Sequence, residues 1–473
     1  MYFYIKIITD RKIGYDDMKL ERFKVQDNKK RFIIVFTVCC VLLLAGVFLY
    51  TSFAVFTEEK QFNLINGTYQ DPGDLYFAVY VDGQITNTFP SKDSGYTLDT
   101  EKSSCTNGAT VSWDNDSWSA LVNFSNYSAG NMSRTKCTMY FKEQTAYDKC
   151  IAEGKDEVTC NMIANVDTSG QCPTVNDDGT VNVTSAESEN GYICSAPDDY
   201  GTSYYFRGNV DNNYVKFAGF YWRILRINGD GTIRMIYDGT TAHPNGEASE
   251  DRQVGTSAYN TSRNDNAYVG YMYGTTGSSS YEETHANIND STIKTVVDNW
   301  YKTNIEEAGY ASYISDTLFC NDRSFASNNT ETGAGISTTY YRWYNGPWTS
   351  GTNKTNPRLM CKEQNDRFTV EDTQMGNGDL TYPVGLLTTD EAALAGGYSA
   401  TNSGYYLYTG NYYWTMSPSD FFGSIAYVRF VGSAGTLDSS FSVSASYGVQ
   451  PVLNLKSGSL KSGSGTALDP YLV

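Results

Sequence analysis

An uncharged apolar run near the N-terminus constrains this chain most strongly. The run begins at Phe32, after Arg31, and continues with little polarity to Phe56. A helix rises about 1.5 Å per residue, so roughly 20 apolar residues span a hydrocarbon core of about 30 Å. A helix buried in a protein core would normally carry one polar face, which this run lacks. The sequence therefore predicts a transmembrane helix over residues 32–56, with the lipid bilayer as its partner.

The charges beside the run predict its orientation. Three basic residues at 29–31 precede it, and two glutamates at 58–59 follow it. Positive residues are retained in the cytoplasm, so residues 1–31 are expected to form a basic cytoplasmic tail and the remainder an extracellular ectodomain. A cleaved secretory signal is the alternative, because residues 51–54 (Thr-Ser-Phe-Ala) suit a signal peptidase. The run exceeds the roughly 7–15 residues of an ordinary signal sequence, which favours a retained single-pass anchor in the cell membrane.

The cysteines fit an exported chain. Cys39 and Cys40 lie in the apolar run, and the other eight are an even number that suits disulfide bonds in an oxidising compartment. No CxxC occurs and the chain has 2 histidines, so we expect no metal site and no cofactor. Eight cysteines allow about 105 pairings, among which the sequence does not choose. Closure between neighbours would pair Cys105 with Cys137, Cys150 with Cys160, Cys172 with Cys194 and Cys320 with Cys361.

Composition narrows the class of partner. A net charge of −18 without a basic stripe makes nucleic acid a poor partner. The 39 tyrosines, with abundant Asn, Ser and Gly, are typical of an extracellular recognition surface, because Tyr gives a large contact area at low entropic cost. Solvated β-structure would account for many of these tyrosines equally well.

Periodicity divides the rest of the ectodomain. Residues 57–143 are expected to form an all-β, sandwich-like domain that opens with a hairpin turning at Asp82-Gly83. Residues 144–195 hold four cysteines and little periodicity, which predicts a disulfide-stapled connector. Residues 196–458 are expected to form an α+β domain, and residues 459–473 a Gly/Ser-rich C-terminal segment.

Two helices are predicted within the α+β domain. One carries Ile293, Val296, Val297 and Trp300 at helical spacing. The other begins at a capping box on Thr388 and stops at two glycines, residues 396–397. Strand patterns surround both helices.

The C-terminal part of the chain resembles a known family. The resemblance is carried by residues 383–397, 414–418 (Trp-Thr-Met-Ser-Pro), 426–428, 432–435 and 448–453. These segments resemble a bacterial surface-protein domain family of unknown function, similar in fold to formylglycine-generating-enzyme relatives and retroelement variable proteins. The resemblance spans residues 200–458 and implies a C-type-lectin-like fold and a surface location, but no reaction. Gln450 stands where family members commonly have Arg, so the resemblance implies no salt bridge there.

The leading hypothesis is a non-enzymatic binding or adhesion module for an unknown extracellular protein or glycan. A strand over residues 441–447 is expected to bury Phe441 and Val443 and to expose a row of serines. The residues expected to border the recognition face are Trp414, Tyr427, Arg429, Ser442, Ser444 and Ser446.

Two other functions stay open. An exported glycan or cell-wall hydrolase would use a pair of carboxylates that the sequence does not locate. An envelope component would assemble laterally with copies of itself. No catalytic residue is predicted, because His243 and His285 stand beside no nucleophile motif and are expected in exposed loops. Cys320 and Cys361 are expected to form a structural disulfide rather than a redox site.

Overall fold

The structure is a computed structural model that describes residues 60–63, 75–86, 88–92, 94–114, 117–123, 135–167 and 169–473. The chain divides into two compact units, Met1–Glu143 and Gln144–Val473. The predicted cytoplasmic tail and transmembrane helix lie outside the described residues. Among the helices that the structure describes, none is both long and apolar enough to cross a membrane.

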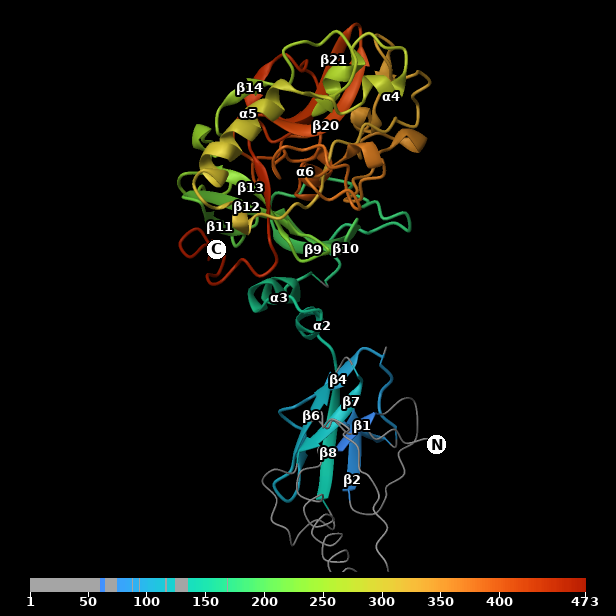
Figure 1. Cartoon of the computed structure of the whole chain (residues 1–473), viewed down its shortest axis with the longest axis vertical. Coiled ribbons are helices and arrows are strands. Elements are labelled where there is room, and N and C mark those ends of the chain that lie inside the picture. Colours follow the sequence, from blue (N-terminus) through green and yellow to red (C-terminus); the bar gives the residue numbers. More distant parts are fainter. Residues whose placement is uncertain are drawn as a thin grey trace, which may run out of the picture. The chain divides into compact units, whose positions relative to one another are not determined.

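The N-terminal unit is built from two sheets (Figure 1). Its strands are β1 (Lys60–Asn63), β2 (Leu75–Val81), β3 (Gln84–Thr86), β4 (Tyr96–Leu98), β5 (Ser104–Cys105), β6 (Thr110–Asp114), β7 (Ser119–Asn123) and β8 (Thr135–Glu143). One sheet has the order β1-β7-β6, and the other β3-β2-β8-β4 with β5 on β8. The buried core draws Ala120 from the first sheet and Val79, Met139 and Phe141 from the second.

The predicted hairpin of this unit is confirmed. Strands β2 and β3 pair in antiparallel register from Val81 opposite Gln84. Asp82 and Gly83 both have positive φ, at 49° and 74°, as a type I′ turn requires.

The C-terminal unit contains two large sheets and two small ones. Its strands are β9 (Gly191–Asp198), β10 (Gly201–Gly208), β11 (Tyr214–Phe217), β12 (Phe220–Ile227), β13 (Ile233–Gly239), β14 (Thr256–Ala258), β15 (Met272–Tyr273), β16 (Asn289–Asp290), β17 (Phe319–Cys320), β18 (Thr339–Tyr340), β19 (Arg367–Phe368), β20 (Tyr413–Phe422), β21 (Ile425–Val431), β22 (Leu437–Asp438), β23 (Ser446–Gly448), β24 (Val452–Leu455) and β25 (Tyr471–Leu472). The first large sheet has the order β24-β13-β12-β10-β9, with β11 on β12 and β25 on β11. The second has the order β14-β23-β20-β21-β22, with β18 on β20.

The helices within the described residues are short. They are α2 (Ala146–Ala152), α3 (Glu157–Ala164), α4 (Tyr281–Thr284), α5 (Thr292–Tyr301) and α6 (Thr389–Leu394), with single turns η1 (Glu250–Arg252), η2 (Asn266–Val269), η3 (Lys302–Glu306), η4 (Ala311–Tyr313), η5 (Arg342–Tyr344), η6 (Gly351–Asn353) and η7 (Gln364–Asp366). Both predicted helices are confirmed as α5 and α6, and the capping box of Thr388 with Glu391 is formed.

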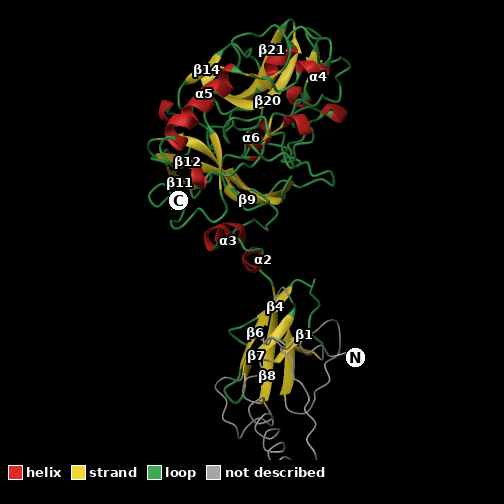
Figure 2. Cartoon of the chain, viewed as in Figure 1, coloured by secondary structure: helices red, strands yellow, loops and turns green. Residues whose placement is uncertain are grey.

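The predicted fold class is nevertheless wrong. A transmembrane helix followed by an all-β domain and an α+β C-type-lectin-like domain was expected, whereas the described residues are mostly β-sheet and loop (Figure 2). Helix α5 has 10 residues and α6 has 6. The two helical patterns are real, but most of the unit's framework comes from strands, including the hairpin pairs β9–β10, β12–β13 and β20–β21.

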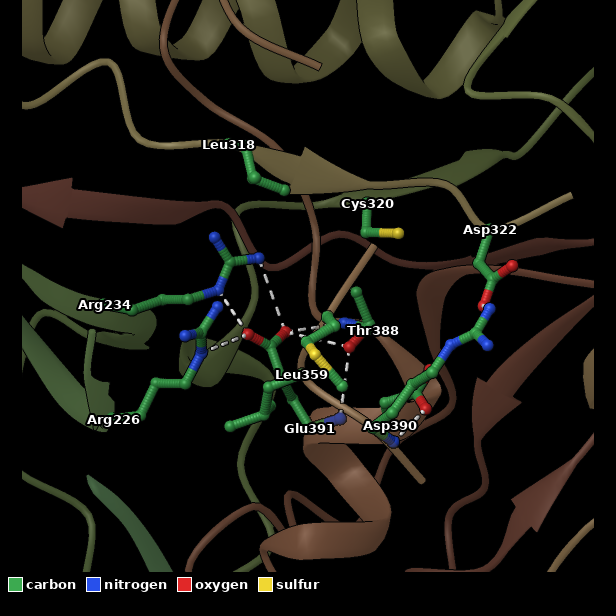
Figure 3. A pocket seen from close by; sticks show the side chains of 11 residues that line it. Arg226, Arg234, Leu318, Cys320, Asp322, Leu359, Thr388, Asp390 and Glu391 are labelled. Carbon is green, nitrogen blue, oxygen red and sulfur yellow. Dashed lines mark hydrogen bonds and ion pairs between the residues drawn. The ribbon is translucent and has the colours of Figure 1, made fainter. Parts of the chain in front are cut away.

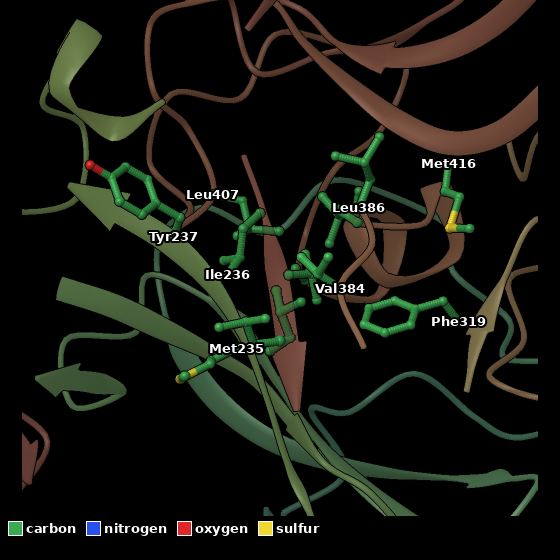
Figure 4. Packing of buried hydrophobic residues seen from close by; sticks show 14 of the residues in the cluster. Met235, Ile236, Tyr237, Phe319, Val384, Leu386, Leu407 and Met416 are labelled. Atoms are coloured by element: carbon green, nitrogen blue, oxygen red, sulfur yellow. The ribbon is translucent and has the colours of Figure 1, made fainter. Parts of the chain in front are cut away.

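The core of the C-terminal unit joins strand β13 to residues from its second half. Met235, Ile236 and Tyr237 of β13 belong to one buried cluster with Val384 and Leu386 (Figure 4). Leu407, Met416 and Phe319 belong to the same buried cluster. Each leucine, isoleucine or valine buried in this way stabilises the unit by roughly 1.5–3 kcal/mol.

The described residues form four disulfides, each within one unit, and all four nearest-neighbour pairs are confirmed. Cys105–Cys137 lies in the N-terminal unit, and Cys320–Cys361 joins β17 to a distant loop. Cys150–Cys160 and Cys172–Cys194 lie in the segment expected to be a connector. That segment belongs to the C-terminal unit, because Cys160, Met162 and Ile163 are buried in its main cluster. The Gly/Ser-rich end of the chain also belongs to the C-terminal unit, because its strand β25 pairs with β11.

The predicted strand over residues 441–447 is wrong. Ser442 forms a single bridge with Tyr427, and the Ala445 N–H then donates to the Ser442 carbonyl to close a turn. Strand β23 begins only at Ser446. The turn breaks the alternation, so Phe441 is 45% exposed although Val443 is fully buried.

Candidate functional surface

A hairpin in the second large sheet positions the candidate site. Strands β20 and β21 are joined through Gly423 and Ser424, whose φ angles of 60° and 63° match a type I′ turn. Because residues directly opposite each other in a sheet share a face, the register decides which side chains meet.

One row of side chains crosses this hairpin. Tyr340 of β18 lies opposite Asp420 of β20, and Asp420 lies opposite Tyr427 of β21. Tyr427 in turn bridges to Ser442. Phe422 lies two residues beyond Asp420 on β20 and therefore shares its face. We define the β20–β21 face as Tyr340, Tyr344, Asp420, Phe422, Tyr427 and Ser442.

The aromatic members of this face are all at least partly exposed to solvent. Phe422 is 57% exposed and Tyr344 is 39% exposed. Tyr340 and Tyr427 are half-buried. The rings of Tyr340 and Tyr344 lie with their centroids 4.1 Å apart. Large aromatic side chains gathered on one surface are typical of binding sites.

A carboxylate lies in the middle of the row. The Ser419 hydroxyl donates to Asp420 Oδ1 at 2.7 Å. Burial raises the pKa of Asp420 to about 6, although Ser419 and Arg429 act in the opposite direction. No ion pair in the part of the chain that the structure describes includes this carboxylate.

Arg429 lies two residues from Tyr427 on β21, on the same face of the sheet, and connects it to turn η5. Its Nε donates to the Trp343 carbonyl at 2.7 Å, and its Nη2 donates to the Tyr344 carbonyl at 2.8 Å. Burial lowers the pKa of Arg429 to about 10, opposed by Asp420. Arg429 therefore holds turn η5, and with it Tyr344, against the sheet.

The structure brings together only some of the predicted site residues. Tyr427 and Ser442 belong to the β20–β21 face, and Ser444 lies beside it, with its Oγ 2.9 Å from Ser442 Oγ. Ser446 is exposed on β23, opposite Ala258.

Trp414 is fully buried, and its indole N–H donates to the Ser257 carbonyl. Trp414 pairs with Phe430, which alternates with Arg429 along β21 and therefore lies on the opposite face of the sheet. There Trp414 forms an aromatic cluster with Tyr412, Phe430, Phe441 and Tyr447.

Sequence reasoning missed four members of the face. Asp420 and Phe422 follow the Trp414 motif on the same strand, but simple alternation would have grouped them with buried Trp414, because two register shifts lie between Trp414 and Asp420. Tyr340 and Tyr344 gave no usable signal, because β18 has 2 residues and η5 has 3.

A second group of charged residues lines a small cavity inside the same unit. Figure 3 shows the guanidinium groups of Arg226 and Arg234 directed toward the carboxylate of Glu391. Burial alone would raise the pKa of Glu391, but Arg234 and Arg226 lower it below its ordinary value. The cavity has a volume of about 20 Å³, room for about one water molecule. This network is therefore too enclosed to receive a substrate.

The other side of the cavity repeats the same chemistry. Arg358 Nη2 donates to Asp322 Oδ2 at 2.9 Å, and the Arg358 N–H donates to Asp390 Oδ1 at 2.8 Å. The Trp343 indole donates to Asp390 Oδ2 at 2.7 Å. Burial raises the pKa of Asp322. The neighbouring arginines Arg342 and Arg358 lower it more, so the pKa of Asp322 is well below its ordinary value.

Both histidines are buried, so the prediction of exposed loop residues is wrong. His285 Nε2 lies 2.9 Å from the Gly333 carbonyl, and burial lowers its pKa well below the ordinary value. His243 lies 3.2 Å from Glu247 and 3.0 Å from Asp251 through its two ring nitrogens. Across the described ranges, no three His, Cys, Asp or Glu residues are grouped so that they could hold a metal ion.

No family model, curated protein or solved structure matches the chain. The family resemblance therefore stays a prediction.

Proposed function

We propose that this chain is a membrane-anchored cell-surface protein that binds an extracellular protein or glycan without catalysing a reaction. The β20–β21 face is the proposed recognition surface. The observation that carries the proposal is the row in which Asp420 lies between two tyrosines, with exposed Phe422 and Tyr344 beside it.

The chemistry of the row supports binding rather than turnover. Partly exposed rings offer a large contact area at low entropic cost, and a central carboxylate accepts hydrogen bonds from a partner. Hydrolysis of a glycan would need a second catalytic carboxylate about 5–10 Å from the first. The β20–β21 face has Asp420 as its one acid.

A binding panel tests the proposal. The full chain, purified in detergent, is probed against extracellular proteins and glycans, and each binder is then measured against a Tyr344→Ala/Tyr427→Ala variant. Tyr412→Ala is the matched control, because Tyr412 is 40% exposed but belongs to the aromatic cluster around Trp414. We expect the double variant to lose binding and the control to keep it. Binders that bind the double variant as tightly as the wild-type chain would refute this location of the site.

Membrane attachment is the second part of the proposal. It is supported by the uncharged segment 32–56, by the basic residues before it, and by four disulfides in the ectodomain. Protease added to intact cells should digest the chain after residue 57 and spare the basic tail. Cleavage of the tail in sealed cells would reverse the topology, and release of an ectodomain beginning near Val55 would support a cleaved signal.

A further inference from the structure

The carboxylate of Asp420 forms no ion pair in the described part of the chain, although Arg429 attracts it from the neighbouring strand. Arg429 lies on the neighbouring strand β21. Its Nε and Nη2 donate hydrogen bonds to backbone carbonyls rather than to Asp420. Most buried charges in proteins are paired, because an isolated carboxylate loses its hydration without compensation. Glu391 of the same unit follows this rule, because it is paired with two arginines. Asp420 is therefore an exception that a bound partner would remove.

We propose that the β20–β21 face receives a lysine or arginine side chain of a protein partner, with Asp420 as its counter-ion and the flanking tyrosine rings as its walls. This inference rests on the proposed binding function and names the chemistry of its ligand. The face would bind one cationic side chain at a time. The partner segment that carries this side chain would contact the exposed rings.

The geometry of the row suits a cation. Side chains directly opposite in a sheet have Cβ atoms about 4.5–5.5 Å apart, so Tyr340 and Tyr427 stand on either side of Asp420 at that spacing. A cation within about 6 Å of a ring centroid is attracted by the ring face. A lysine or arginine that reaches Asp420 therefore comes within reach of both rings.

The same unit already uses this type of contact internally. Lys216 Nζ lies 3.9 Å from the centroid of the Tyr221 ring. The guanidinium of Arg223 lies 3.9 Å from the centroid of the Tyr214 ring. In the β20–β21 face the rings and the acid are present, and the cation would come from the partner.

The charge of the whole chain favours the same class of partner. Its net charge is −18, so long-range attraction steers basic surfaces toward it and repels acidic ones. One exposed cation, Arg263, lies at the end of the row, where its Nη1 is 3.5 Å from Ser442 Oγ. We therefore expect the cationic side chain to bind at the Tyr340 and Asp420 end of the row.

A multivalent probe tests the inference directly. Streptavidin carrying biotinylated glycine-flanked arginine or lysine peptides is passed over the immobilised full chain, with a glutamine peptide and a neutral oligosaccharide as matched probes. Multivalent display makes a weak single contact measurable. The variants are Asp420→Asn, which removes the charge with little change of shape, and Asp211→Asn, which removes one exposed carboxylate between β10 and β11. Thermal melting confirms that both variants are folded.

The wild-type chain should bind the arginine and lysine probes at least about tenfold more tightly than the glutamine probe. Asp420→Asn should remove that difference, and Asp211→Asn should keep it. Cation binding that survives Asp420→Asn, or no preference for the cationic probes, overturns the inference. Binding of the oligosaccharide that is lost in Tyr344→Ala/Tyr427→Ala but kept in Asp420→Asn would overturn the inference and leave the proposed binding function standing.

Discussion

Asp420 lies directly opposite Tyr427 in the register between β20 and β21, and opposite Tyr340 on its other side. This arrangement places a desolvated carboxylate among aromatic rings at the surface of the C-terminal unit. A group that costs stability in the folded chain is a candidate for a functional role, because nothing in folding requires it. The stability of the chain should therefore report on this residue.

Replacing Asp420 with Asn should stabilise the protein at neutral pH. Burial raises the pKa of Asp420 from 3.8 to about 6, so the folded state holds its proton more tightly than the unfolded state. The protonated group favours folding at low pH, and this contribution is lost as the pH rises through about 6. The difference between the two pKa values corresponds to about 3 kcal/mol.

Chemical denaturation at two pH values checks this prediction. Asp420→Asn should raise the free energy of unfolding by up to about 3 kcal/mol at pH 7.5, and by only about 1 kcal/mol at pH 4.5. Asp211→Asn should change neither value by more than about 0.5 kcal/mol. An equal gain at both pH values would show that Asp420 is not desolvated.

Replacing Glu391 with Gln should destabilise the C-terminal unit strongly. The substitution leaves Arg234 buried without a counter-ion and Arg226 with Asp198 alone, and breaking a buried pair from one side costs about 3–5 kcal/mol. The pKa of Glu391 is lowered, so its ionised form stabilises the fold above the unfolded value near 4.5 and this contribution is lost as the pH falls below it. The effect should therefore be largest at neutral pH. The exposed control Glu363→Gln should be nearly neutral, and a mild effect of Glu391→Gln would contradict the paired geometry.

Local signals in the sequence were sufficient for local structure. Asp82-Gly83 specified a type I′ turn, and Thr388 with Glu391 specified the start of α6. The neighbouring cysteines were also close enough to pair in all four cases. Each of these features depends on residues that are near one another in the chain.

The pairing of strands that are distant in sequence could not be predicted from these local signals. Strand β18 has 2 residues and meets β20 about 80 positions later, so its place beside Asp420 left no periodic trace. The serine row at 442–446 alternated like a strand, but a turn at residues 442–445 interrupts it. The β content was underestimated as well, because a strand of 2 residues such as β18 or β22 is too short to show an alternation.

The disulfides should contribute unequally. Cys320–Cys361 closes a separation of 41 residues and Cys150–Cys160 one of 10. Loop-closure entropy predicts a loss of about 4 kcal/mol when the first pair is replaced by serines, and about 3 kcal/mol for the second. Thiol labelling of the denatured, unreduced chain should detect only Cys39 and Cys40. Labelling at Cys320 or Cys361 would show that this bridge is not formed.

A buried and an exposed residue beside the recognition surface should differ in their effect on stability. Val443 is fully buried, and its N–H donates to the Ala426 carbonyl. Val443→Asp should unfold the C-terminal unit, because an unpaired buried charge costs several kcal/mol. Ser446→Lys, three residues later on an exposed position, should shift the free energy of unfolding by at most about 0.5 kcal/mol. Circular dichroism melting measures both, and a folded Val443→Asp would contradict the packing described for this turn.

Oxidative footprinting of the full chain, with and without a binder from the panel, tests the central claim most directly. The account predicts that Tyr340, Tyr344, Phe422 and Tyr427 become protected from oxidation in the complex. Tyr412 and Tyr313, each 40% exposed but outside the β20–β21 face, should be oxidised equally in both samples. Protection of Tyr412 together with unchanged oxidation of Tyr344 and Tyr427 would contradict the claim that this chain binds its partner through the β20–β21 face.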